Sequence, residues 1–468
     1  MPPSHVVQTQ TQDLVLLLFL LTLLKLQVDD NVALLESLLS DHLREQRRLN
    51  RSLPREKQVP TWAEFSGRIT LQHFNRMFRM LKESFDRLCT KIIDCVGKER
   101  FQPESANNTS TTSNNKKKVT FPGEVKVAIG IRMLSGGLYL DIVPLFQVSI
   151  SWFYVIFDDF LTWILAALDF PLIQLLRDRN WDALEMLAND FAEKSDGIFY
   201  GPFGAMDGLA VRIRLPQMSK VSDHGNYYCR KGFYALNVQA IVDKRKRFLW
   251  TYPSNKGSTH DSAAFQGSRL FQLLCEMGND FSNHGLFLVS DSAYGLAPFL
   301  LVPYDGKELE EDLDHSLDSF NFHLSSCRIY VECAFRELVM RWGIFWRTLL
   351  FDLKKCTKII QVGMLLHNFI IDEREGFNED ASYFQNFSIS MDPIQQQITD
   401  QTNEIPRALV TDNNEPRQAG HHSIEEDALR LKGIEIRNRL TVKLAANGRR
   451  RPILHDMQYN AYGHVYFT

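Results

Sequence analysis

The 468-residue sequence predicts a mixed α/β fold in which a helical N-terminal region precedes a mixed sheet flanked by helices. Three observations favour this fold class. Apolar residues recur at helical spacing up to about residue 195, and the spacing changes to strand-like alternation from about residue 198. The later elements then follow the order β-β-β-α-β-α-α, which is typical of a sheet that opens with a hairpin meander.

The composition narrows the class of protein. With 44% hydrophobic and 23% charged residues, the chain has enough apolar material for an ordinary globular core. A net charge of -3 predicts no general attraction to nucleic acid, so any such attraction needs a local cluster of cations. The seven cysteines are scattered and include no Cys-x-x-Cys, which favours a reduced intracellular protein over a disulfide framework or a zinc site.

Residues 1–58 are predicted to be a helical N-terminal segment whose role the sequence leaves open. The apolar run at 14–26 is short for a membrane span, which needs roughly 20 apolar residues. It also lacks the basic residues that precede the apolar core of a signal peptide. We therefore expect a buried or partner-binding helix and no membrane association, with a signal or anchor as the alternative.

Two helical regions follow, separated by a polar linker. In residues 59–106 apolar side chains recur at helical spacing among many charges, which predicts amphipathic helices. Residues 107–118 are a polar low-complexity linker. Residues 119–195 again predict helices, at 125–134, at 138–146 and from 152 onward, and Ser149 or Ser151 suits the N-cap of the third.

Residues 119–195 have the outline of a helix-turn-helix, but their charge is unsuited to reading DNA. No Lys or Arg lies between Met133 and Leu176, whereas a DNA-reading helix needs cations to meet the phosphates. The helix in the recognition position also runs into Asp158 and Asp159. We therefore expect an all-helical packing or partner-docking domain, with direct DNA reading as the alternative.

Residues 196–375 are predicted to form the sheet and its helices. Strands are expected at 205–215, 233–242 and 247–253, with an Asp-Lys-Arg-Lys-Arg hairpin connection between the last two. A helix at 260–277, a short buried strand at 285–290 and helices at 321–347 and 354–371 complete the pattern. Residues 376–468 are polar, which predicts a largely disordered tail with one helix at 423–444.

Three acidic residues stand where a sheet and a later helix can bring them together. Asp207 and Asp291 lie in or beside strand-like runs, and Glu332 lies in a stretch with helical spacing. Carboxylates gathered in this way hold hard divalent cations, and two such cations can cleave a phosphodiester.

Each acid also has a simpler interpretation. Asp207 before glycine is typical of a turn, and Asp291 of a loop or cap. Glu332 can form an ion pair with Arg328 or Arg336.

Six short motifs surround these acids in a fixed order. They are Met-Asp-Gly at 206–208, Tyr-Tyr-Cys-Arg-Lys-Gly-Phe-Tyr-Ala-Leu-Asn-Val-Gln at 227–239, Gly-Ser-Thr-His-Asp-Ser at 257–262, Ser-Asp-Ser-Ala-Tyr at 290–294, Val-Glu-Cys-Ala-Phe at 331–335 and Leu-His-Asn-Phe at 366–369. Together they resemble the PIF/Harbinger group of DDE transposases and their domesticated nuclease relatives. The resemblance implies an RNase H-like catalytic core, with Asp207, Asp291 and Glu332 as a catalytic triad that binds Mg²⁺ or Mn²⁺.

The resemblance also suggests roles for residues around the triad. Asp261, in Thr-His-Asp-Ser, is expected either to bind the metal or to act as the N-cap of the next helix. Arg328, one helical turn before Glu332, is expected to orient that carboxylate or to contact a phosphate. His260 and His367 are expected to be structural hydrogen-bonding residues, with a role as ligands as the alternative, and His260 is expected to support the site.

The stretch from Asp207 to His260 is basic, with ten Lys and Arg against three acids. Aromatic residues interleave with these cations, and a basic, aromatic surface is what a DNA backbone requires. The predicted DNA-binding residues are Arg212, Arg214, Arg230, Lys231, Lys244, Arg245, Lys246 and Arg247. A hairpin made soluble by its charges is the alternative for the last four.

These observations predict a Harbinger-type DDE endonuclease or transposase that hydrolyses DNA phosphodiesters, with strand transfer as a second reaction. The resemblance further implies DNA and a Myb-like DNA-binding protein as partners. It also implies a nuclear location, with a cytoplasmic one in the absence of that partner as the alternative; oligomer formation stays open. The alternative is a domesticated, catalytically inactive DNA- or protein-binding module that keeps the fold. It stays open because Ser290, Cys333 and Arg336, beside the acids, depart from the family pattern.

Overall fold

The computed structural model describes residues 61–102, 121–217, 221–376, 424–451, 458–459 and 465–466, all in one unit of the chain, residues 60–468. The predicted N-terminal segment 1–58 and linker 107–118 lie outside these residues, as does most of the tail from residue 377 to 423.

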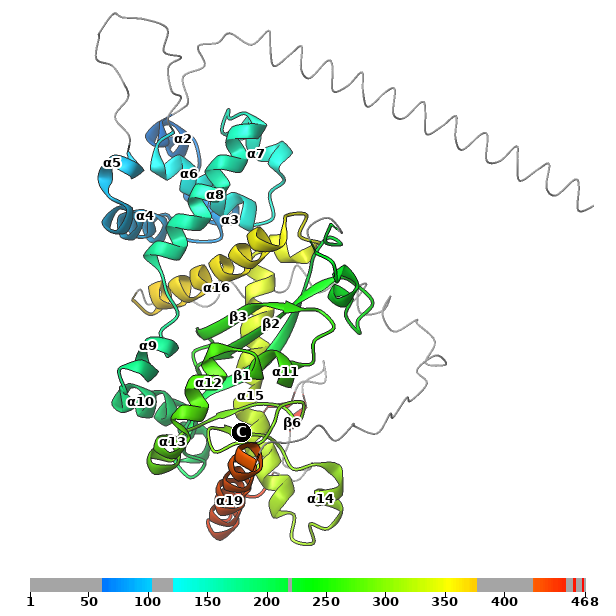
Figure 1. Ribbon diagram of the computed structural model, residues 1–468. Helices are drawn as coiled ribbons and strands as arrows, with labels where there is room; N and C mark the ends of the chain where they lie inside the picture. Colours follow the sequence, from blue (N-terminus) through cyan, green and yellow to red (C-terminus); the bar gives the residue numbers. More distant parts are fainter. Residues whose placement is uncertain are drawn as a thin grey trace, which may run out of the picture. The chain divides into compact units, whose positions relative to one another are not determined.

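A five-stranded mixed sheet has the strand order β3-β2-β1-β4-β5. β2 is antiparallel to both β1 and β3, whereas β4 is parallel to β1 and β5 is parallel to β4. The strands are β1 (Pro202–Arg212), β2 (Ala235–Val242), β3 (Phe248–Lys256), β4 (Phe287–Val289) and β5 (Leu300–Leu301). The mixed α/β fold class and the opening meander are therefore confirmed (Figure 1).

Helices cover both faces of this sheet (Figure 1). On one face the long helices α15 (Ser316–Arg341) and α16 (Leu353–Gly376) pack on β1, β2 and β3. The other face is covered by shorter helices, which are α9 (Leu172–Arg177), α10 (Trp181–Ala192), α11 (Asp261–Gln266), α12 (Arg269–Glu276) and α13 (Gly278–His284). The short elements η1 (Glu193–Ser195), η2 (His224–Tyr227), η3 (Gly343–Trp346) and α14 (Gly306–Glu310) connect them.

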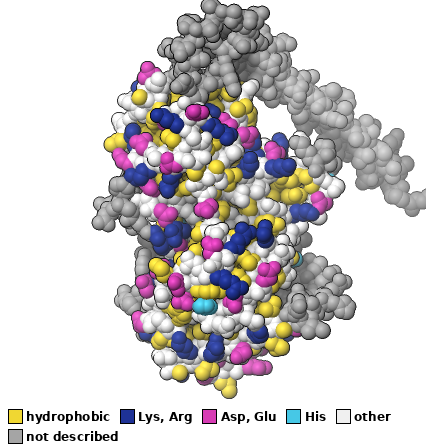
Figure 2. Space-filling model, turned by 60° about the vertical axis from the view of Figure 1, so that its left-hand side comes forward, with side chains coloured by type: hydrophobic (Ala, Val, Ile, Leu, Met, Phe, Trp, Pro, Cys, Tyr) yellow, Lys and Arg dark blue, Asp and Glu magenta, His cyan; other side chains and the backbone are white. Residues whose placement is uncertain are grey.

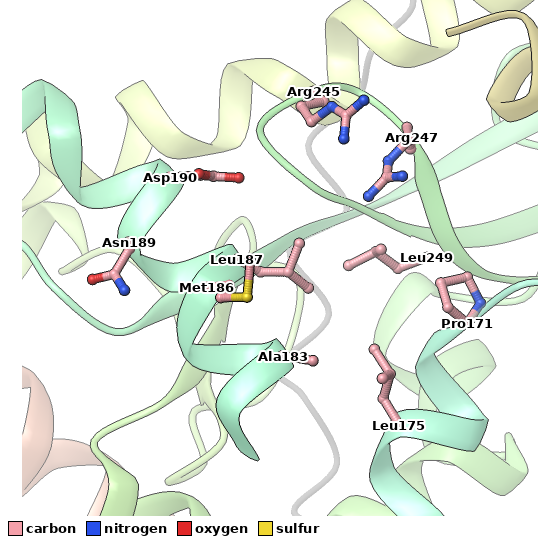
Figure 3. Close-up of a pocket in the computed structure, with 10 residues that line it drawn as sticks. All are labelled: Pro171, Leu175, Ala183, Met186, Leu187, Asn189, Asp190, Arg245, Arg247 and Leu249. Carbon is pink, nitrogen blue, oxygen red and sulfur yellow. The ribbon is translucent and has the colours of Figure 1, made fainter. Parts of the chain in front are cut away.

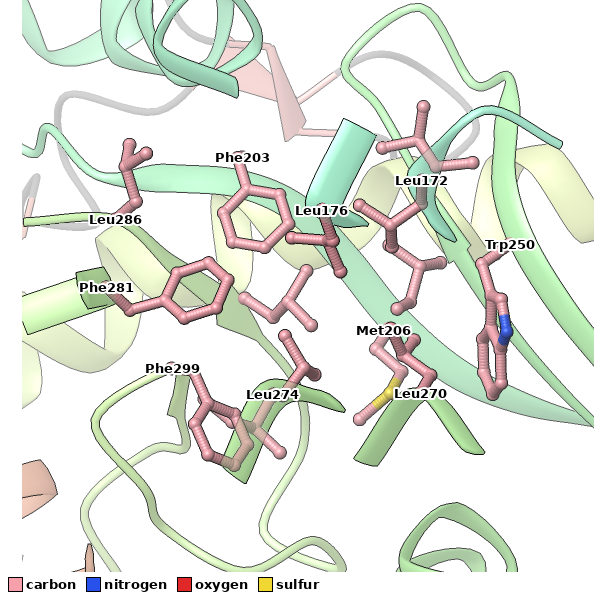
Figure 4. Packing of buried hydrophobic residues seen from close by; sticks show 14 of the residues in the cluster. Leu172, Leu176, Phe203, Met206, Trp250, Leu270, Leu274, Phe281, Leu286 and Phe299 are labelled. Atoms are coloured by element: carbon pink, nitrogen blue, oxygen red, sulfur yellow. The ribbon is translucent and has the colours of Figure 1, made fainter. Parts of the chain in front are cut away.

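Figure 4 shows the hydrophobic core between the shorter helices and the sheet. Met206 of β1, Leu270 and Leu274 of α12 and Phe281 of α13 are buried in it. Successive side chains of a strand point to opposite faces. Because Met206 faces this core, its neighbour Asp207 faces the side of α15.

The helices before the sheet form one packed group. They are α2 (Trp62–Gly67), α3 (Leu71–Phe78), α4 (Lys82–Val96), α5 (Lys98–Phe101), α6 (Gly123–Leu134), α7 (Tyr139–Leu145) and α8 (Ile150–Ala167). Phe65 of α2 stacks on Phe146 after α7 with ring centroids 4.6 Å apart, so the two predicted helical regions share one interior. Ser149 is the N-cap of α8, and its side chain accepts a hydrogen bond from the Trp152 amide, as predicted.

α8, the helix in the recognition position, is a packing helix. It contacts α4, α6 and α16, and Phe153, Ile156 and Phe157 are fully buried in these contacts. Among the described residues, the helical stretch Ile150–Arg177 is long and apolar enough to cross a membrane. Part of this stretch is buried in the protein, because Phe153 and Phe157 pack inside the helical group and Leu172 lies in the core of the sheet.

Three features differ from the sequence prediction. The helix predicted at 260–277 is split into α11 and α12, because Gly267 ends the first and the Ser268 side chain caps the second. β5 was not predicted, since two residues carry no alternation. α9 and α10, placed by the prediction in a helical domain at 119–195, instead contribute Leu172, Leu176 and Leu184 to the core of the sheet.

The C-terminal residues carry α19 (Ile424–Ala446), where the sequence predicted one helix at 423–444, and the strand pair β6 (Gln458–Tyr459) and β7 (Val465–Tyr466). α19 packs on α15 and β5. This helix is thus part of the sheet domain, although it follows a long polar segment.

Candidate functional site

The sheet register brings Asp207 and Asp291 to the same level. In the parallel pair of β1 and β4, Ala205 lies opposite Val289, and each aspartate follows two residues later in its own segment. Asp207 lies inside β1, so the interpretation of Asp207-Gly208 as a turn is wrong. Asp291 comes two residues after the end of β4, and its Oδ1 accepts a hydrogen bond from the Ala293 amide at 3.0 Å.

Asp207 is an unusual carboxyl because its side chain is mostly buried, with 21% exposed. Burial raises its pKa from 3.8 to about 6, and the nearby negative charges of Asp291 and Asp261 add to the increase. The Gly208 amide, which donates to Asp207 Oδ1 at 2.7 Å, and the Arg328 guanidinium oppose it. The ionised form of a carboxyl in this setting becomes more stable when a cation is added beside it.

Arg328 and Glu332 lie one helical turn apart on α15, and the Arg328 side chain reaches β1. Arg328 Nη2 donates to Glu332 Oε1 at 2.7 Å and lies 3.8 Å from Asp207 Oδ2. The Glu332 side chain is 54% exposed. The ion pair offered as the simpler interpretation of Glu332 is therefore present. The same arginine also lies near Asp207, so one positive charge links two of the three predicted catalytic acids.

Asp261 is the first residue of α11 and does not cap it. His260 occupies the N-cap position, with no hydrogen bond from its side chain to the helix. Asp261 Oδ1 instead accepts hydrogen bonds from Asn237 Nδ2 and Gln239 Nε2, both at 2.9 Å. A Cβ at Gly208 would lie 2.4 Å from Asp261 Oδ1, so only glycine permits this approach. Successive residues of a strand point to opposite faces, so Gly208 and the side chain of Asp207 lie on opposite faces of β1. Asp261 therefore contacts β1 on the face opposite to Arg328.

Sequence reasoning missed the polar residues that hold Asp261. Asn237 and Gln239 are buried in β2, and the Tyr294 hydroxyl donates to Gln239 Oε1 at 2.5 Å. Burial together with the charges of Asp261, Asp207 and Asp291 raises the pKa of Tyr294, which keeps it a hydrogen-bond donor. Two amides in an otherwise apolar buried strand were the available signal, because buried polar groups need partners.

Within the described ranges, no three Asp, Glu, His or Cys side chains stand close enough together to hold a metal ion. Asp207 and Asp291 share one level of the sheet, while the third acid, Glu332, is held by Arg328. A site with all three acids therefore needs the Glu332 side chain to leave Arg328.

The two predicted supporting histidines differ in their surroundings. His260 is exposed, and the structure gives its side chain no role at the acids. His367 of α16 is fully buried, and its Nε2 lies 3.0 Å from the Lys246 carbonyl oxygen. His367 thus supports the connection between β2 and β3.

The eight predicted DNA-binding cations fall into two groups at opposite ends of β2. Those of the β2–β3 connection are paired with acids. Lys244 pairs with Glu193, and Lys246 pairs with Glu337. Arg245 and Arg247 lie 3.7 and 3.0 Å from Asp372, and Arg247 also pairs with Asp243 at 2.8 Å. These ion pairs agree with the alternative of a structural, solvated hairpin.

The other four cations are exposed at the opposite end. Arg230 and Lys231 occupy the centre of a turn closed by the hydrogen bond from the Gly232 amide to the Cys229 carbonyl at 3.0 Å. Arg212 lies 4.1 Å over the Phe233 ring, and Arg214 follows on the same segment. Among the described residues, none of these four cations forms an ion pair with an acid.

Figures 2 and 3 show two further features of the described surface. In the view of Figure 2, Lys and Arg are interspersed with Asp and Glu. A cavity of about 530 Å³ opens beside α9, α10 and β3 (Figure 3). Its lining is mainly apolar, with Leu175, Met186 and Leu249, and Arg245 and Arg247 stand at its edge. None of the candidate acids lines this cavity.

Comparisons with known proteins relate part of this chain to a known family. Residues 206–368 match the family described as DDE superfamily endonuclease, and this span contains all three candidate acids. The chain is also 25% identical over 383 residues to "Protein ALP1-like" of Arabidopsis thaliana, a match that covers 75% of this chain and 84% of that protein. No solved structure gives a significant match. Residues 206–368, which hold most of the mixed sheet and all three candidate acids, therefore match a DDE superfamily endonuclease domain.

Proposed function

We propose that this chain is a metal-dependent DNA endonuclease of the Harbinger DDE type, with Asp207, Asp291 and Glu332 as its catalytic acids. One observation carries the proposal. Asp207 in β1 and Asp291, two residues after the parallel β4, share a level of the sheet, and Arg328 pairs with Glu332 and lies 3.8 Å from Asp207 Oδ2. Three acids that gathered a divalent cation in a region matching the DDE endonuclease family would have a direct chemical use, since phosphodiester cleavage needs a concentrated positive charge.

The donor set fits a divalent cation. Carboxylate oxygens are the ligands that Mg²⁺ and Mn²⁺ prefer, and Asp207, Asp291 and Glu332 would hold the ion. When bound, it would activate the attacking water and stabilise the charge that develops on the phosphate. The raised pKa of Asp207 supports this fit, because burial without a cation disfavours its ionised form. Asp261 would act at the edge of the site through its charge.

Arg328 would change its hydrogen-bond partner when a divalent cation binds to the site. Its guanidinium holds Glu332 in the absence of a divalent cation, and release of that carboxylate would leave the arginine facing the substrate. The Arg328 Nε is buried and lacks a hydrogen-bond partner within the described structure. A phosphate oxygen is a suitable acceptor for such a donor. We assign Arg328 to phosphate contact on this ground.

DNA would reach the acids along the exposed cations at the end of β1. Arg212, Arg214, Arg230 and Lys231 are exposed and form no ion pair among the described residues, so their charges are available to phosphates. The cations of the β2–β3 connection are excluded from this role because acids of the same chain already pair with them.

Nicking of supercoiled duplex DNA by the purified full chain with Mn²⁺ tests the function. We expect Asp207→Asn, Asp291→Asn and Glu332→Gln each to abolish nicking. Glu83→Gln, which changes an exposed carboxylate of α4, should leave it intact. Nicking that survives Asp291→Asn would rule out the assignment of the acids.

A catalytically inactive DNA- or protein-binding module is the second candidate. The pairing of Glu332 with Arg328 favours it, because an occupied carboxylate is not free to bind metal. Tight DNA binding without nicking at any Mn²⁺ concentration would decide for this candidate.

Strand transfer, a Myb-like partner protein and a nuclear location complete the proposal. A helical region without Lys or Arg between Met133 and Leu176 supports reliance on a separate DNA-reading protein. Imaging of the tagged full chain with and without a co-expressed Myb-like protein tests this part. Nuclear accumulation only with the partner is the expected result, and its absence in both cases would contradict it.

A further inference from the structure

The helix α19 is packed into the sheet domain although it lies outside residues 206–368. It contacts α15 and β5, and Ile436, Leu440 and Leu444 on its inner face are buried. Burial of three aliphatic side chains removes their apolar surface from water and so favours the docked position of the helix. α19 is therefore a stable part of this domain.

Polar contacts anchor α19 at Tyr304, three residues after β5. The Tyr304 hydroxyl donates to Asn438 Oδ1 at 2.9 Å and lies 2.8 Å from Thr441 Oγ1. The Arg437 guanidinium lies 3.8 Å over the Tyr304 ring and donates to Glu308 Oε1 at 2.6 Å. Buried hydrogen bonds of this kind fix the register of the helix against β5, because each displaced partner would lose its acceptor or donor.

Gly433 of α19 packs closely against the loop that follows Asp291. A Cβ at Gly433 would lie 2.9 Å from Leu296 Cγ and 3.0 and 3.1 Å from the backbone C and N of Ala297. The backbone cannot give way as the end of a flexible side chain can. Only glycine at position 433 therefore lets α19 approach this loop so closely.

The loop under α19 begins at the candidate site. Asp291 is its first acid, and Tyr294 donates from its hydroxyl to Gln239 Oε1 at 2.5 Å. Gln239 Nε2 in turn donates to Asp261 Oδ1 at 2.9 Å. At the other end of the loop, Leu301 of β5 accepts from the Ser290 amide at 3.1 Å. α19 thus contacts the middle of this loop at Leu296 and Ala297 and the strand β5 that follows it, and β5 in turn bonds to Ser290 beside Asp291.

We infer that α19 positions Asp291 by bracing the loop of residues 291–299 at Leu296 and Ala297. Gly433 and Tyr304 are positioning residues in this arrangement, since they act through the loop and not on a reacting atom. The inference rests on the proposed function for its consequence, because the position of Asp291 matters only if that carboxylate binds metal. The catalytic unit then extends beyond residues 206–368 to include α19.

Two variants and one matched control test the inference in the full chain. Gly433→Leu pushes α19 away from Ala297, and Tyr304→Phe removes the hydroxyl that bonds to Asn438 and Thr441 while it keeps the ring. Val442→Leu changes a side chain of the same helix that is 68% exposed. The measurements are Mn²⁺ affinity, from the electron paramagnetic resonance signal of free Mn²⁺, and hydrogen exchange of the amides of 293–297.

We expect both variants to weaken Mn²⁺ binding about tenfold, as loss of support behind a metal ligand does. Exchange at 293–297 should accelerate in both, and Val442→Leu should match the wild type. If Gly433→Leu does not fold, Tyr304→Phe alone decides. Unchanged exchange and affinity would overturn the inference. A wild-type chain that binds no Mn²⁺ would refute the proposed function, and the exchange rates would still decide whether α19 braces the loop.

Discussion

At the scale of single residues, the buried carboxylate of Asp207 is predicted to lower the free energy of unfolding until a divalent cation binds beside it. Burial raises its pKa to about 6, so the folded chain favours the protonated carboxyl. The folding stability lost through its ionisation therefore grows as pH rises from near 4 through 6 and is complete above that range. In chelator, we expect Asp207→Asn to be more stable than the wild type by on the order of 1 kcal/mol at about pH 7.5. The gap should narrow at about pH 5, where the wild-type carboxyl is mostly protonated. Chemical denaturation at both pH values checks this, and a less stable variant at the higher pH would mean that the attraction of Arg328 outweighs burial.

Arg328 gives the second prediction at this scale. Its guanidinium competes with a divalent cation for Glu332 and Asp207, so Arg328→Gln should tighten Mn²⁺ binding roughly threefold to tenfold. The same change should slow nicking, since the phosphate contact is lost. Arg336→Gln is the matched control, because Arg336 lies one turn beyond Glu332 and is exposed. Calorimetric titration with Mn²⁺ measures the affinities, and weaker binding by Arg328→Gln would show that the arginine positions Glu332 for the metal.

The sequence predicted the candidate acids but not their surroundings. Asp207, Asp291 and Glu332 were found from their order along the chain and from the motifs around them. The pairing of Arg328 with Glu332 was predictable from helical spacing. The approach of Asp261 to Gly208 and the bonds from Asn237 and Gln239 were not, because they depend on strand register and on which face each residue occupies.

At the scale of elements, the crossing of α6 and α8 depends on Gly130. A Cβ there would lie 2.1 Å from Cγ of the buried Phe160. Overpacking of this kind costs about 1–3 kcal/mol, which exceeds the helix propensity gained by alanine. We therefore expect Gly130→Ala to lower the midpoint of thermal unfolding. Gly67→Ala, where nothing lies within 4 Å, should leave it unchanged or slightly higher. Equal midpoints for both variants would show that Phe160 can repack without loss.

Elements whose hydrophobic residues recur with a clear period were predicted from the sequence, whereas elements without such a period were not. The helices of the N-terminal group and the three strands of the meander carry clear periodicity, and Ser149 marked the start of α8 correctly. β5 has two residues and no pattern. The docking of α9 and α10 on the sheet also left no local signal, since an amphipathic helix does not encode which surface it covers.

At the scale of the whole molecule, the sequence predicted one basic surface and the structure divides it. All eight cations lie within one basic stretch, yet folding pairs Lys244, Lys246 and Arg247 with acids that are distant in sequence. Only the tertiary fold brings Glu193, Glu337 and Asp372 to them. The net charge of -3 likewise conceals a local group of exposed cations near the end of β1.

This division predicts the salt dependence of DNA binding. Each cation that neutralises a phosphate contributes about -0.9 to the slope of log affinity against log salt. Arg230→Ala with Lys231→Ala should therefore make the slope shallower by about 2, because both side chains are exposed and carry no ion pair among the described residues. Lys244→Ala with Lys246→Ala should leave the slope unchanged, since those charges are already balanced by Glu193 and Glu337. Fluorescence anisotropy of a labelled duplex between about 50 and 200 mM salt measures both slopes. An equal loss from the two pairs would mean that DNA displaces the internal acids and that the whole basic stretch binds as one surface.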